Sequence, residues 1–344
     1  MTDLRAKRIE QFLARFGWAE ARRRPLAGDA SFRRYDRLGN GSTAVLMDAP
    51  PEYEDVRPFV AIARHLRSLG LSAPDIIAAD AEAGLLLLED LGDDLYVRLL
   101  ETPDKGLQDS LYRAAVDVLV KLHKHPAPDR LPGVDGSLFR VPDYDAGPLL
   151  DEANLFIDWY LPAVTGAPLT SDCRQMFEAM WRSLFPVAEA GPRVLALRDY
   201  HANNLMWLPE RDGVARVGLL DFQDALRGSA AYDLVSLLQD ARRDVPPELE
   251  QAMIDYYLAA RPELDRESFL AAYAMLGAQR NTKVIGIFTR LAVRDAKPLY
   301  LEMIDRVWGL LERDLAHPAL EPARRWFDRW VPREVRQPPK LEDG

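Results

Sequence analysis

Residues 197–207 have the sequence LRDYHANNLMW, and residues 218–224 have the sequence GLLDFQD. The two stretches flank a predicted β-hairpin, so that Asp199 lies on a loop, Asn204 follows five residues later, and Asp221 comes after the hairpin. A single Asp-x-x-x-x-Asn match occurs by chance in many proteins. The strand, loop, hairpin and Leu-Leu-Asp-Phe order taken together indicates one constructed site.

The spacing is typical of a kinase. Phosphoryl transfer from a nucleoside triphosphate develops charge on phosphate oxygens, and Mg²⁺ offsets that charge when hard oxygen ligands converge on it from two backbone segments. Asn204 and Asp221 are the predicted metal ligands, and Asp199 is predicted to accept the proton of the attacking hydroxyl. We expect Asp233 to anchor this loop by buried hydrogen bonds, and His201 to be a packing residue.

The rest of the chain predicts an α+β, two-lobed, protein-kinase-like fold with a small antiparallel β N-lobe and a larger, mostly helical C-lobe. We place the N-lobe at residues 1–90 and the C-lobe at 91–344. The N-lobe has a helix from Leu4 to Phe16, and its other predicted elements are strand pieces within 24–48, a helix at 56–66, and strands at 76–79 and 85–89. Beyond residue 92, apolar residues recur at helical spacing and predict helices over 107–122, 147–164, 171–187, 230–243, 247–260, 266–291 and 296–314. The Pro-rich tail from Val331 is expected to be loose.

The nucleotide side is less clearly marked. Residues 27–32 have the sequence AGDASF, a turn suited to cover phosphates with backbone N–H groups, and its candidates are Gly28, Asp29, Ser31 and Phe32. The backbone of Glu89 and Leu91 is predicted to pair with the adenine edge of ATP, and Asp90 between them is a further nucleotide-binding candidate.

Two residues usual in kinases are replaced. Met47 stands where a phosphate-binding lysine is expected and cannot donate a hydrogen bond. Arg33 or Arg34 supplies that charge instead, and strand alternation favours only one of the two. Leu197 replaces the usual histidine two residues before the catalytic aspartate, so the structural support of the loop must differ.

Composition limits the partners. The 344 residues include 44 Lys and Arg against 54 Asp and Glu, a net charge of −10, so no general field attracts nucleic acid or anionic lipid. The single cysteine, Cys173, excludes an internal disulfide framework and fits a reducing compartment. The charged N-terminus lacks an export signal, and no apolar run is long enough to span a bilayer. We expect a cytoplasmic protein, as a monomer, with no nucleic-acid or membrane partner.

The motif Arg198-Asp199 to Asn204, with Asp221, resembles that of the aminoglycoside phosphotransferase and choline kinase superfamily. More narrowly, the chain looks like the anomeric N-acetylmuramate/N-acetylglucosamine kinases. The matching segments are GDASFRRY at 28–35, LMDAPP at 46–51, LLEDLGD at 87–93, DWYLP at 158–162 and GLLDFQDA at 218–225. Met47 lies within the matched segment 46–51, and the resemblance therefore implies that a methionine at this position is a trait of the subfamily.

The resemblance implies transfer of the γ-phosphate of ATP, with Mg²⁺, to the C1 hydroxyl of N-acetylmuramate or N-acetylglucosamine in peptidoglycan recycling. It implies a catalytic role for Arg198 beside Asp199. For the amino-sugar acceptor we expect carboxylates and aromatic faces to bind hydroxyls and C–H faces, although a Trp-Tyr pair on a helix is more often core. The acceptor candidates are Glu152, Asp158, Trp159, Tyr160, Asp224 and Arg280, the last with Asn281 and Lys283 as candidates to meet a lactyl carboxylate.

Two other functions stay open. One is a kinase of the same fold acting on another hydroxyl compound, such as an aminoglycoside or a choline-like amino alcohol. The other is a nucleotide-binding pseudokinase that serves as a scaffold, motivated by the missing lysine and histidine and opposed by the retention of Asp199, Asn204 and Asp221.

Overall fold

The computed structural model describes residues 2–26, 32–134, 136–167, 170–189 and 191–340. Tertiary contacts divide the chain into two compact units. We call the first the sheet unit; it comprises Met1–Leu122, Pro128–Val141 and Ala202–Ala225. We call the second the helical unit; it comprises His123–Ala127, Pro142–His201 and Leu226–Gly344. The division at residue 90 between a nucleotide-covering lobe and a catalytic lobe stays a prediction.

The sheet unit contains a five-stranded antiparallel sheet with the order β1-β2-β3-β5-β4. The predicted small antiparallel sheet is therefore confirmed. Its strands are β1 (Arg22–Pro25), β2 (Arg34–Gly39), β3 (Thr43–Asp48), β4 (Ile76–Asp80) and β5 (Leu85–Glu89).

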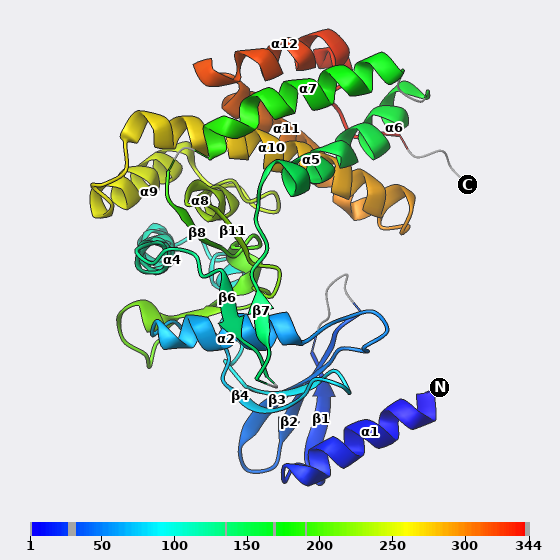
Figure 1. The fold of residues 1–344 in the computed structure, drawn as a ribbon, viewed down its shortest axis with the longest axis vertical. Coiled ribbons are helices and arrows are strands. Elements are labelled where there is room, and N and C mark those ends of the chain that lie inside the picture. The colour runs from blue at the N-terminus through cyan, green and yellow to red at the C-terminus, as the bar shows by residue number, and fades with distance from the viewer. Residues whose placement is uncertain (1, 27–31, 135, 168–169, 190, 341–344) are drawn as a thin grey trace. The chain divides into compact units, whose positions relative to one another are not determined.

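Helix α1 (Thr2–Arg15) covers one face of this sheet (Figure 1). Successive side chains of a strand point to opposite faces, so Leu46 of β3 and Leu87 of β5 point to the same face and meet Phe12 and Leu13 of the helix. Met47 alternates to the opposite face, where it is buried between Tyr35 and Leu86 on the neighbouring strands. The residue in the expected lysine position is thus part of the apolar core.

The remaining elements of the sheet unit include a second helix and a short hairpin that carries part of the candidate site. Strands β9 and β10 are antiparallel, with Leu205 opposite Leu219. This confirms the hairpin expected between the two diagnostic stretches, with a 3₁₀ turn, η3 (Gly213–Arg216), inside its connection. The elements are α2 (Arg57–Ser68), α3 (Tyr96–Leu99), α4 (Lys105–His123, whose last residue groups with the helical unit), β6 (Arg130–Pro132), β7 (Leu138–Arg140), η2 (Ala202–Asn204), β9 (Leu205–Trp207) and β10 (Val217–Leu219).

The helical unit is built around the 28-residue helix α10 (Arg266–Val293), which packs against α5, α7, α8 and α11. The packing is closest at Gly286, where an added Cβ would lie 2.4 Å from the carbonyl carbon of Leu155. The predicted helix over 147–164 contains a π-helical turn after residue 155. The elements are α5 (Ala146–Leu155), η1 (Phe156–Tyr160), α6 (Leu161–Thr165), α7 (Ser171–Ala188), β8 (Arg193–Ala196), β11 (Leu226–Ser229), α8 (Ala231–Leu238), α9 (Pro247–Ala260), η4 (Pro298–Met303), α11 (Ile304–Leu315), η5 (Pro318–Leu320), α12 (Glu321–Trp330) and η6 (Arg333–Val335).

The expectation of a loose tail from Val331 is wrong for its described part. Arg336 forms ion pairs with Glu312 and Asp328, at 2.9 and 2.8 Å, and its guanidinium lies over the ring of Trp308. Composition favoured an open chain, but one arginine with two carboxylates and an aromatic face supplies enough contacts to hold the segment.

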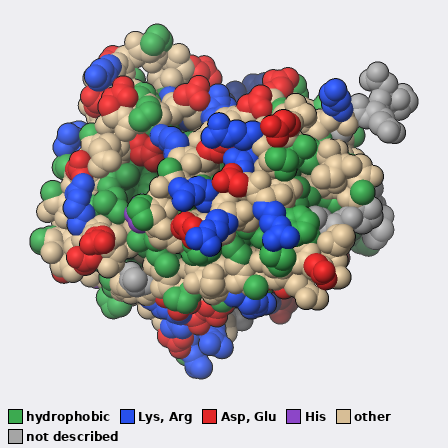
Figure 2. Space-filling model, turned by 90° about the horizontal axis from the view of Figure 1, so that it is seen from above, with side chains coloured by type: hydrophobic (Ala, Val, Ile, Leu, Met, Phe, Trp, Pro, Cys, Tyr) green, Lys and Arg blue, Asp and Glu red, His purple; other side chains and the backbone are tan. Residues whose placement is uncertain are grey.

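The surface has no single sign of charge on the face shown in Figure 2, where Lys and Arg side chains are interspersed with Asp and Glu. Among the helices that the structure describes, none is long and apolar enough to cross a membrane.

Candidate active site

The loop that carries Asp199 begins after strand β8 of the helical unit. The backbone N–H groups of Leu197 and Arg198 donate to the carboxylate of Asp233 at 2.7 and 2.9 Å, and Ser236 Oγ donates to the carbonyl oxygen of Arg198 at 3.1 Å. These bonds hold the backbone of Arg198 at φ = +70°, in the left-handed region that residues other than glycine rarely adopt. The predicted anchoring role of Asp233 is confirmed.

A buried histidine supports the anchor from the other side. His123 Nε2 lies 3.9 Å from the Asp233 carboxylate, and its Nδ1 lies 2.8 Å from the hydroxyl of Tyr257. Burial lowers the pKa of His123, so its ring is neutral near pH 7. Asp233, with this neutral partner, gives the loop the support that Leu197 in place of the usual histidine does not provide.

Asp199 is surrounded by cations of the helical unit. Burial alone would raise its pKa, but the charges of Lys283, Arg198 and Arg280 lower it below its usual value. His201 is also near, yet burial lowers the pKa of its own ring to about 4, so near pH 7 it carries no charge. The Asp199 carboxylate is therefore ionised at neutral pH, as an acceptor of a hydroxyl proton must be.

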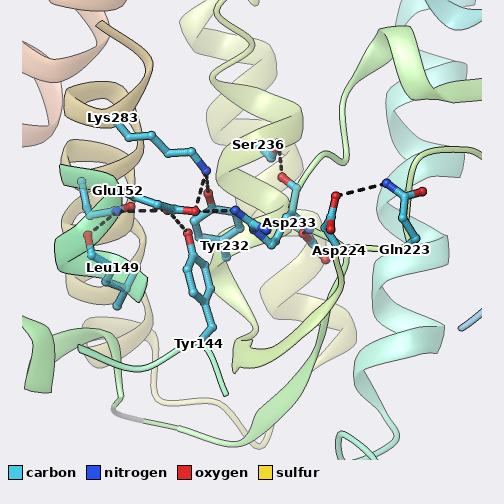
Figure 3. A network of polar contacts seen from close by, with 11 residues as sticks. Tyr144, Leu149, Glu152, Gln223, Asp224, Tyr232, Asp233, Ser236 and Lys283 are labelled. Carbon is cyan, nitrogen blue, oxygen red and sulfur yellow. Dashed lines mark hydrogen bonds and ion pairs between the residues drawn. The ribbon is translucent and has the colours of Figure 1, made fainter. Parts of the chain in front are cut away.

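Glu152 of helix α5 binds two of the cations beside Asp199, of which Figure 3 labels Lys283. Arg198 Nη2 and Lys283 Nζ both donate to Glu152 Oε1, at 2.5 and 2.8 Å. Its other oxygen accepts from the hydroxyl of Tyr144 at 2.5 Å and from Gln279 Nε2 at 3.3 Å. One carboxylate thus holds two cations, which leaves the group with an excess of positive charge toward Asp199.

The pKa values agree with this arrangement. Burial would raise the pKa of Glu152, but Lys283 and Arg198 lower it to about 2. For Lys283, burial would lower the pKa, but Tyr232 and Glu152 raise it above its usual value. Glu152, Lys283 and Arg198 are therefore all charged over the whole neutral pH range.

Arg280 also lies on the Asp199 side of helix α10. Its Nη2 donates to Ser236 Oγ at 3.0 Å, and its side chain is buried. Asn281 faces elsewhere, because its amide donates to Gln239 and Asp314. Lys283 and Arg280 thus both lower the pKa of Asp199, whereas Asn281 belongs to a different hydrogen-bonded group.

The other acceptor candidates lie in different surroundings. Asp158 is exposed and pairs with Arg174, and Trp159 is half-buried in the same π-helical turn. Tyr160 is buried, and its hydroxyl accepts from Trp308 Nε1 at 3.0 Å and donates to the carbonyl oxygen of Val335 at 2.7 Å. These contacts follow the core alternative for Tyr160, while Trp159 is only partly buried.

The predicted metal ligands lie at one end of the β9–β10 hairpin in the sheet unit. Leu220 N donates to the carbonyl oxygen of Asn204 at 3.0 Å. This bond holds Asn204 beside Leu220, the residue that precedes Asp221. Asp221 has φ = +55°, a second side chain in the left-handed region. Its Oδ1 lies 2.9 Å from Gln223 Nε2 and 3.5 Å from Arg33 Nη1.

The chemistry of this pair fits Mg²⁺. An amide and a carboxylate oxygen are hard ligands, and Mg²⁺ is commonly held by one or two protein oxygens, with water and substrate phosphates completing its shell. Among the described residues there is no group of three or more His, Cys, Asp or Glu suited to a metal. Beside Asp221, the buried Gln223 Oε1 has no hydrogen-bond donor in the part of the chain that the structure describes. Asp224 follows it, exposed, and accepts from Gln223 Nε2.

The nucleotide candidates are only partly described. Gly28, Asp29 and Ser31 lie outside the described residues. Phe32 is exposed and stacks on Tyr53, with ring centroids 4.4 Å apart and planes 17° apart.

The two arginines that strand alternation left open differ clearly. Arg33 Nε lies 3.2 Å from the carboxylate of Glu54, and the Arg33 side chain is mostly buried. Arg34, the next residue, is exposed. Of the two, Arg33 is therefore the one directed at Asp221.

The segment predicted to meet adenine is fixed by ion pairs of its side chains. Glu89 pairs with Arg211 at 2.5 Å, and Asp90 pairs with Arg37 at 2.9 Å. Arg37 also donates to the carbonyl oxygen of Gly92 at 2.7 Å. The side-chain carboxylates are thus occupied within the sheet unit, and a role in binding adenine would fall to the backbone.

Two residues of the candidate site escaped the sequence interpretation. Glu54 precedes helix α2 with no spacing that relates it to Arg33, and only the kinase pattern of a cation paired with a carboxylate would have suggested it. Tyr144 lies before helix α5, where its hydroxyl contact with Glu152 depends on tertiary folding alone.

Two relatives match over nearly their whole length. The chain is 44% identical to an N-acetylmuramate/N-acetylglucosamine kinase of Caulobacter vibrioides, covering 95% of this chain and 96% of that protein. It is 39% identical to a protein of the same name from Pseudomonas aeruginosa, covering 89% of this chain and 88% of that one.

A solved structure shares the fold. The ADP-bound aminoglycoside phosphotransferase APH(2'')-Ib superposes with a TM-score of 0.57 at 17% identity, covering 89% of this chain and 97% of that one. The fold is therefore the two-lobed, protein-kinase-like α+β fold that the sequence predicted. A model of the phosphotransferase enzyme family matches residues 22–270. This match and the level of identity to the two relatives show that the chain belongs to the phosphotransferase enzyme family.

Proposed function

We propose that this protein uses ATP and Mg²⁺ to phosphorylate the anomeric C1 hydroxyl of N-acetylmuramate or N-acetylglucosamine. The sugar 1-phosphate so formed would serve cytoplasmic recycling of peptidoglycan sugars. The names of the two relatives and their coverage support the acceptor class. Transfer to a small molecule by a monomer is the simplest form of this activity.

The observation that carries the proposal is the ionised Asp199 carboxylate among Lys283, Arg198 and Arg280. In the proposed reaction the sugar oxygen attacks the γ-phosphorus, the bond from that phosphorus to the bridging oxygen of ADP breaks, and Asp199 takes the hydroxyl proton. A carboxylate that stays ionised orients the hydroxyl throughout the approach.

Asn204 and Asp221 would hold Mg²⁺. The ion, when bound, would offset charge on the phosphate oxygens. The residues themselves contribute position: the hydrogen bond from Leu220 N to Asn204 fixes the hairpin end from which both ligands extend.

The charge around Asp199 favours a neutral or anionic acceptor over a cationic one. Lys283, Arg198 and Arg280 bring three positive charges close to Asp199, and the carboxylates of Glu152 and Asp233 lie in the same group. These cations would disfavour the ammonium group of a choline-like or aminoglycoside acceptor, whereas they would attract the lactyl carboxylate of a muramate.

The test is a direct assay. The protein is incubated with ATP, Mg²⁺ and, separately, N-acetylmuramate, N-acetylglucosamine, choline and an aminoglycoside, and the new phosphate is located by phosphorus NMR. Coupling of the phosphorus to the anomeric proton is expected with an amino sugar. Phosphorylation at C6, or of choline or the aminoglycoside alone, would contradict the proposal.

A variant separates the enzyme from a scaffold. Asp199→Asn is expected to lose about 1000-fold or more in kcat, since the proton acceptor is removed, and to retain ATP binding. Asp151→Asn, at an exposed position of helix α5, is the matched control and is expected to behave as wild type. A wild-type protein that binds ATP and turns over none of the acceptors would support the pseudokinase alternative.

A further inference from the structure

The sheet unit lacks the lysine that kinases use to hold the nucleotide phosphates, because Met47 occupies its position and is buried. In protein kinases that lysine works as a pair with a glutamate, and both must be in place for transfer. The described residues of the sheet unit contain a comparable pair in a different sequence position.

Arg33 and Glu54 form that pair. Arg33 Nε lies 3.2 Å from Glu54 Oε2, and Arg33 Nη1 lies 3.5 Å from Asp221 Oδ1. The side chains of Arg33 and Glu54 are only 13% and 18% exposed. The guanidinium therefore lies between an orienting carboxylate and a predicted metal ligand, which is the place of a cation that meets metal-bound phosphates.

A second contact fixes the same two segments. Phe32 and Tyr53, the residues immediately before Arg33 and Glu54, stack with their ring planes 17° apart. Two adjacent links, one aromatic and one ionic, thus join the segment before β2 to the segment before α2. Such a double link limits the rotamers of Arg33 and lowers the entropy lost when it binds a ligand.

Three other arginines of the sheet unit are either paired elsewhere or exposed. Arg37 binds Asp90, Asp93 and the carbonyl oxygen of Gly92. Arg211 pairs with Glu89. Arg34 is exposed.

We infer that Arg33 binds the phosphate oxygens of the nucleotide in place of the missing lysine, and that Glu54 is its positioning residue. The inference rests on the proposed function for the nature of the reaction, but it concerns the nucleotide and not the acceptor. An arginine has five N–H donors in a planar fork, so it can keep its ion pair with Glu54 while donating to phosphate.

The test measures ADP binding by calorimetry, with and without Mg²⁺, together with KM and kcat. Arg33→Ala is expected to weaken ADP binding and raise KM for ATP by about 10- to 100-fold, because one charge-assisted contact is lost. KM for the acceptor is expected to stay as in wild type. Arg33→Lys, which keeps a point charge, is expected to recover part of the loss.

Glu54 is tested by a double-mutant cycle. Glu54→Ala is expected to raise KM for ATP by less than Arg33→Ala, and the double variant is expected to be no worse than Arg33→Ala, since Glu54 acts through the arginine. A role in folding alone would instead lower the melting temperature and kcat without this dependence. Arg24→Ala, at an exposed position of β1, is the control for loss of an arginine.

Two results would overturn the inference. One is wild-type ADP affinity in a folded Arg33→Ala protein, and the other is an equal loss in Arg34→Ala. Failure of the proposed function is distinguishable, because a protein that phosphorylates no amino sugar can still bind ADP in a manner that depends on Arg33.

Discussion

Helix α10 contacts two carboxylates that behave in opposite ways. Lys283 donates to Glu152, while Asn281, two residues earlier on another face of the helix, donates to Asp314. Burial would raise the pKa of both acids. The pKa of Glu152 is nevertheless lowered to about 2, whereas the pKa of Asp314 is raised well above its usual value.

The partners explain the difference. Glu152 is bound by two cations, but Asp314 accepts from the amides of Gln239 and Asn281 and lies near the carboxylate of Glu250. Amides satisfy hydrogen bonds without stabilising a negative charge as cations do. The cationic partners of Glu152 therefore favour its ionised form, whereas the amide partners of Asp314 leave its protonated form favoured.

The largest effect is expected for Glu152→Gln. The pKa of the Glu152 carboxyl is lowered from 4.5 to about 2 in the folded protein, which corresponds to about 3 kcal/mol of stability. Because the folded-state pKa is depressed, this contribution is present above pH 4.5 and is lost as the pH falls toward 2. Loss of the carboxylate also leaves Arg198 and Lys283 without their shared partner, so kcat is expected to fall about 100-fold through misplacement around Asp199.

Chemical denaturation at pH 7 and at pH 3, together with kcat, checks this prediction. Asp151→Asn, one residue away on the exposed face of α5, is the control. If Glu152→Gln were as stable and as active as wild type, the contrast between the two carboxylates would lose its basis.

An effect of opposite sign is expected for Asp314→Asn. The folded-state pKa is raised, so the folded protein keeps a proton that the unfolded chain loses above about pH 4. Wild-type stability relative to the variant should therefore fall by up to about 1.4 kcal/mol per pH unit as the pH rises from 4 toward the folded-state pKa. Activity at neutral pH is expected to stay unchanged, since this cluster lies outside the proposed site.

Unfolding free energies measured at several pH values for both proteins check the slope. Asp305→Asn, exposed on the same helix α11, is the control and should show no such difference. A parallel pH dependence in wild type and Asp314→Asn would mean that the carboxylate is ionised in the folded protein.

Much of the fold follows from local patterns in the sequence. The short continuous apolar runs in β3 and β5, and the helical spacing of apolar residues in α10, extend over enough residues to predict each element. The hairpin β9–β10 and the role of Asp233 followed from the order of the motif. These features depend on neighbours along the chain.

The other features of the fold and the site depend on tertiary contacts that no periodicity in the sequence encodes. Glu54 meets Arg33 across 21 positions, and Tyr144 meets Glu152 through its hydroxyl only after helix α5 is placed. The docking of the tail depends on Arg336, one residue among several charged ones in a Pro-rich stretch. Pairings of single polar side chains in three dimensions are therefore the part that sequence reasoning could not supply.

The smallest effect is expected for Asp158, which, unlike the two buried carboxylates, forms its ion pair at the surface. Its carboxylate and Arg174 are each about 40% exposed, and such a pair contributes about 0.5 kcal/mol or less. If the pair is only structural, Asp158→Asn and Arg174→Ala should lower the melting temperature by the same small amount and leave KM for the sugar unchanged. If Asp158 binds the acceptor, as the sequence predicts, Asp158→Asn alone should raise that KM, because Arg174 would then be a spectator.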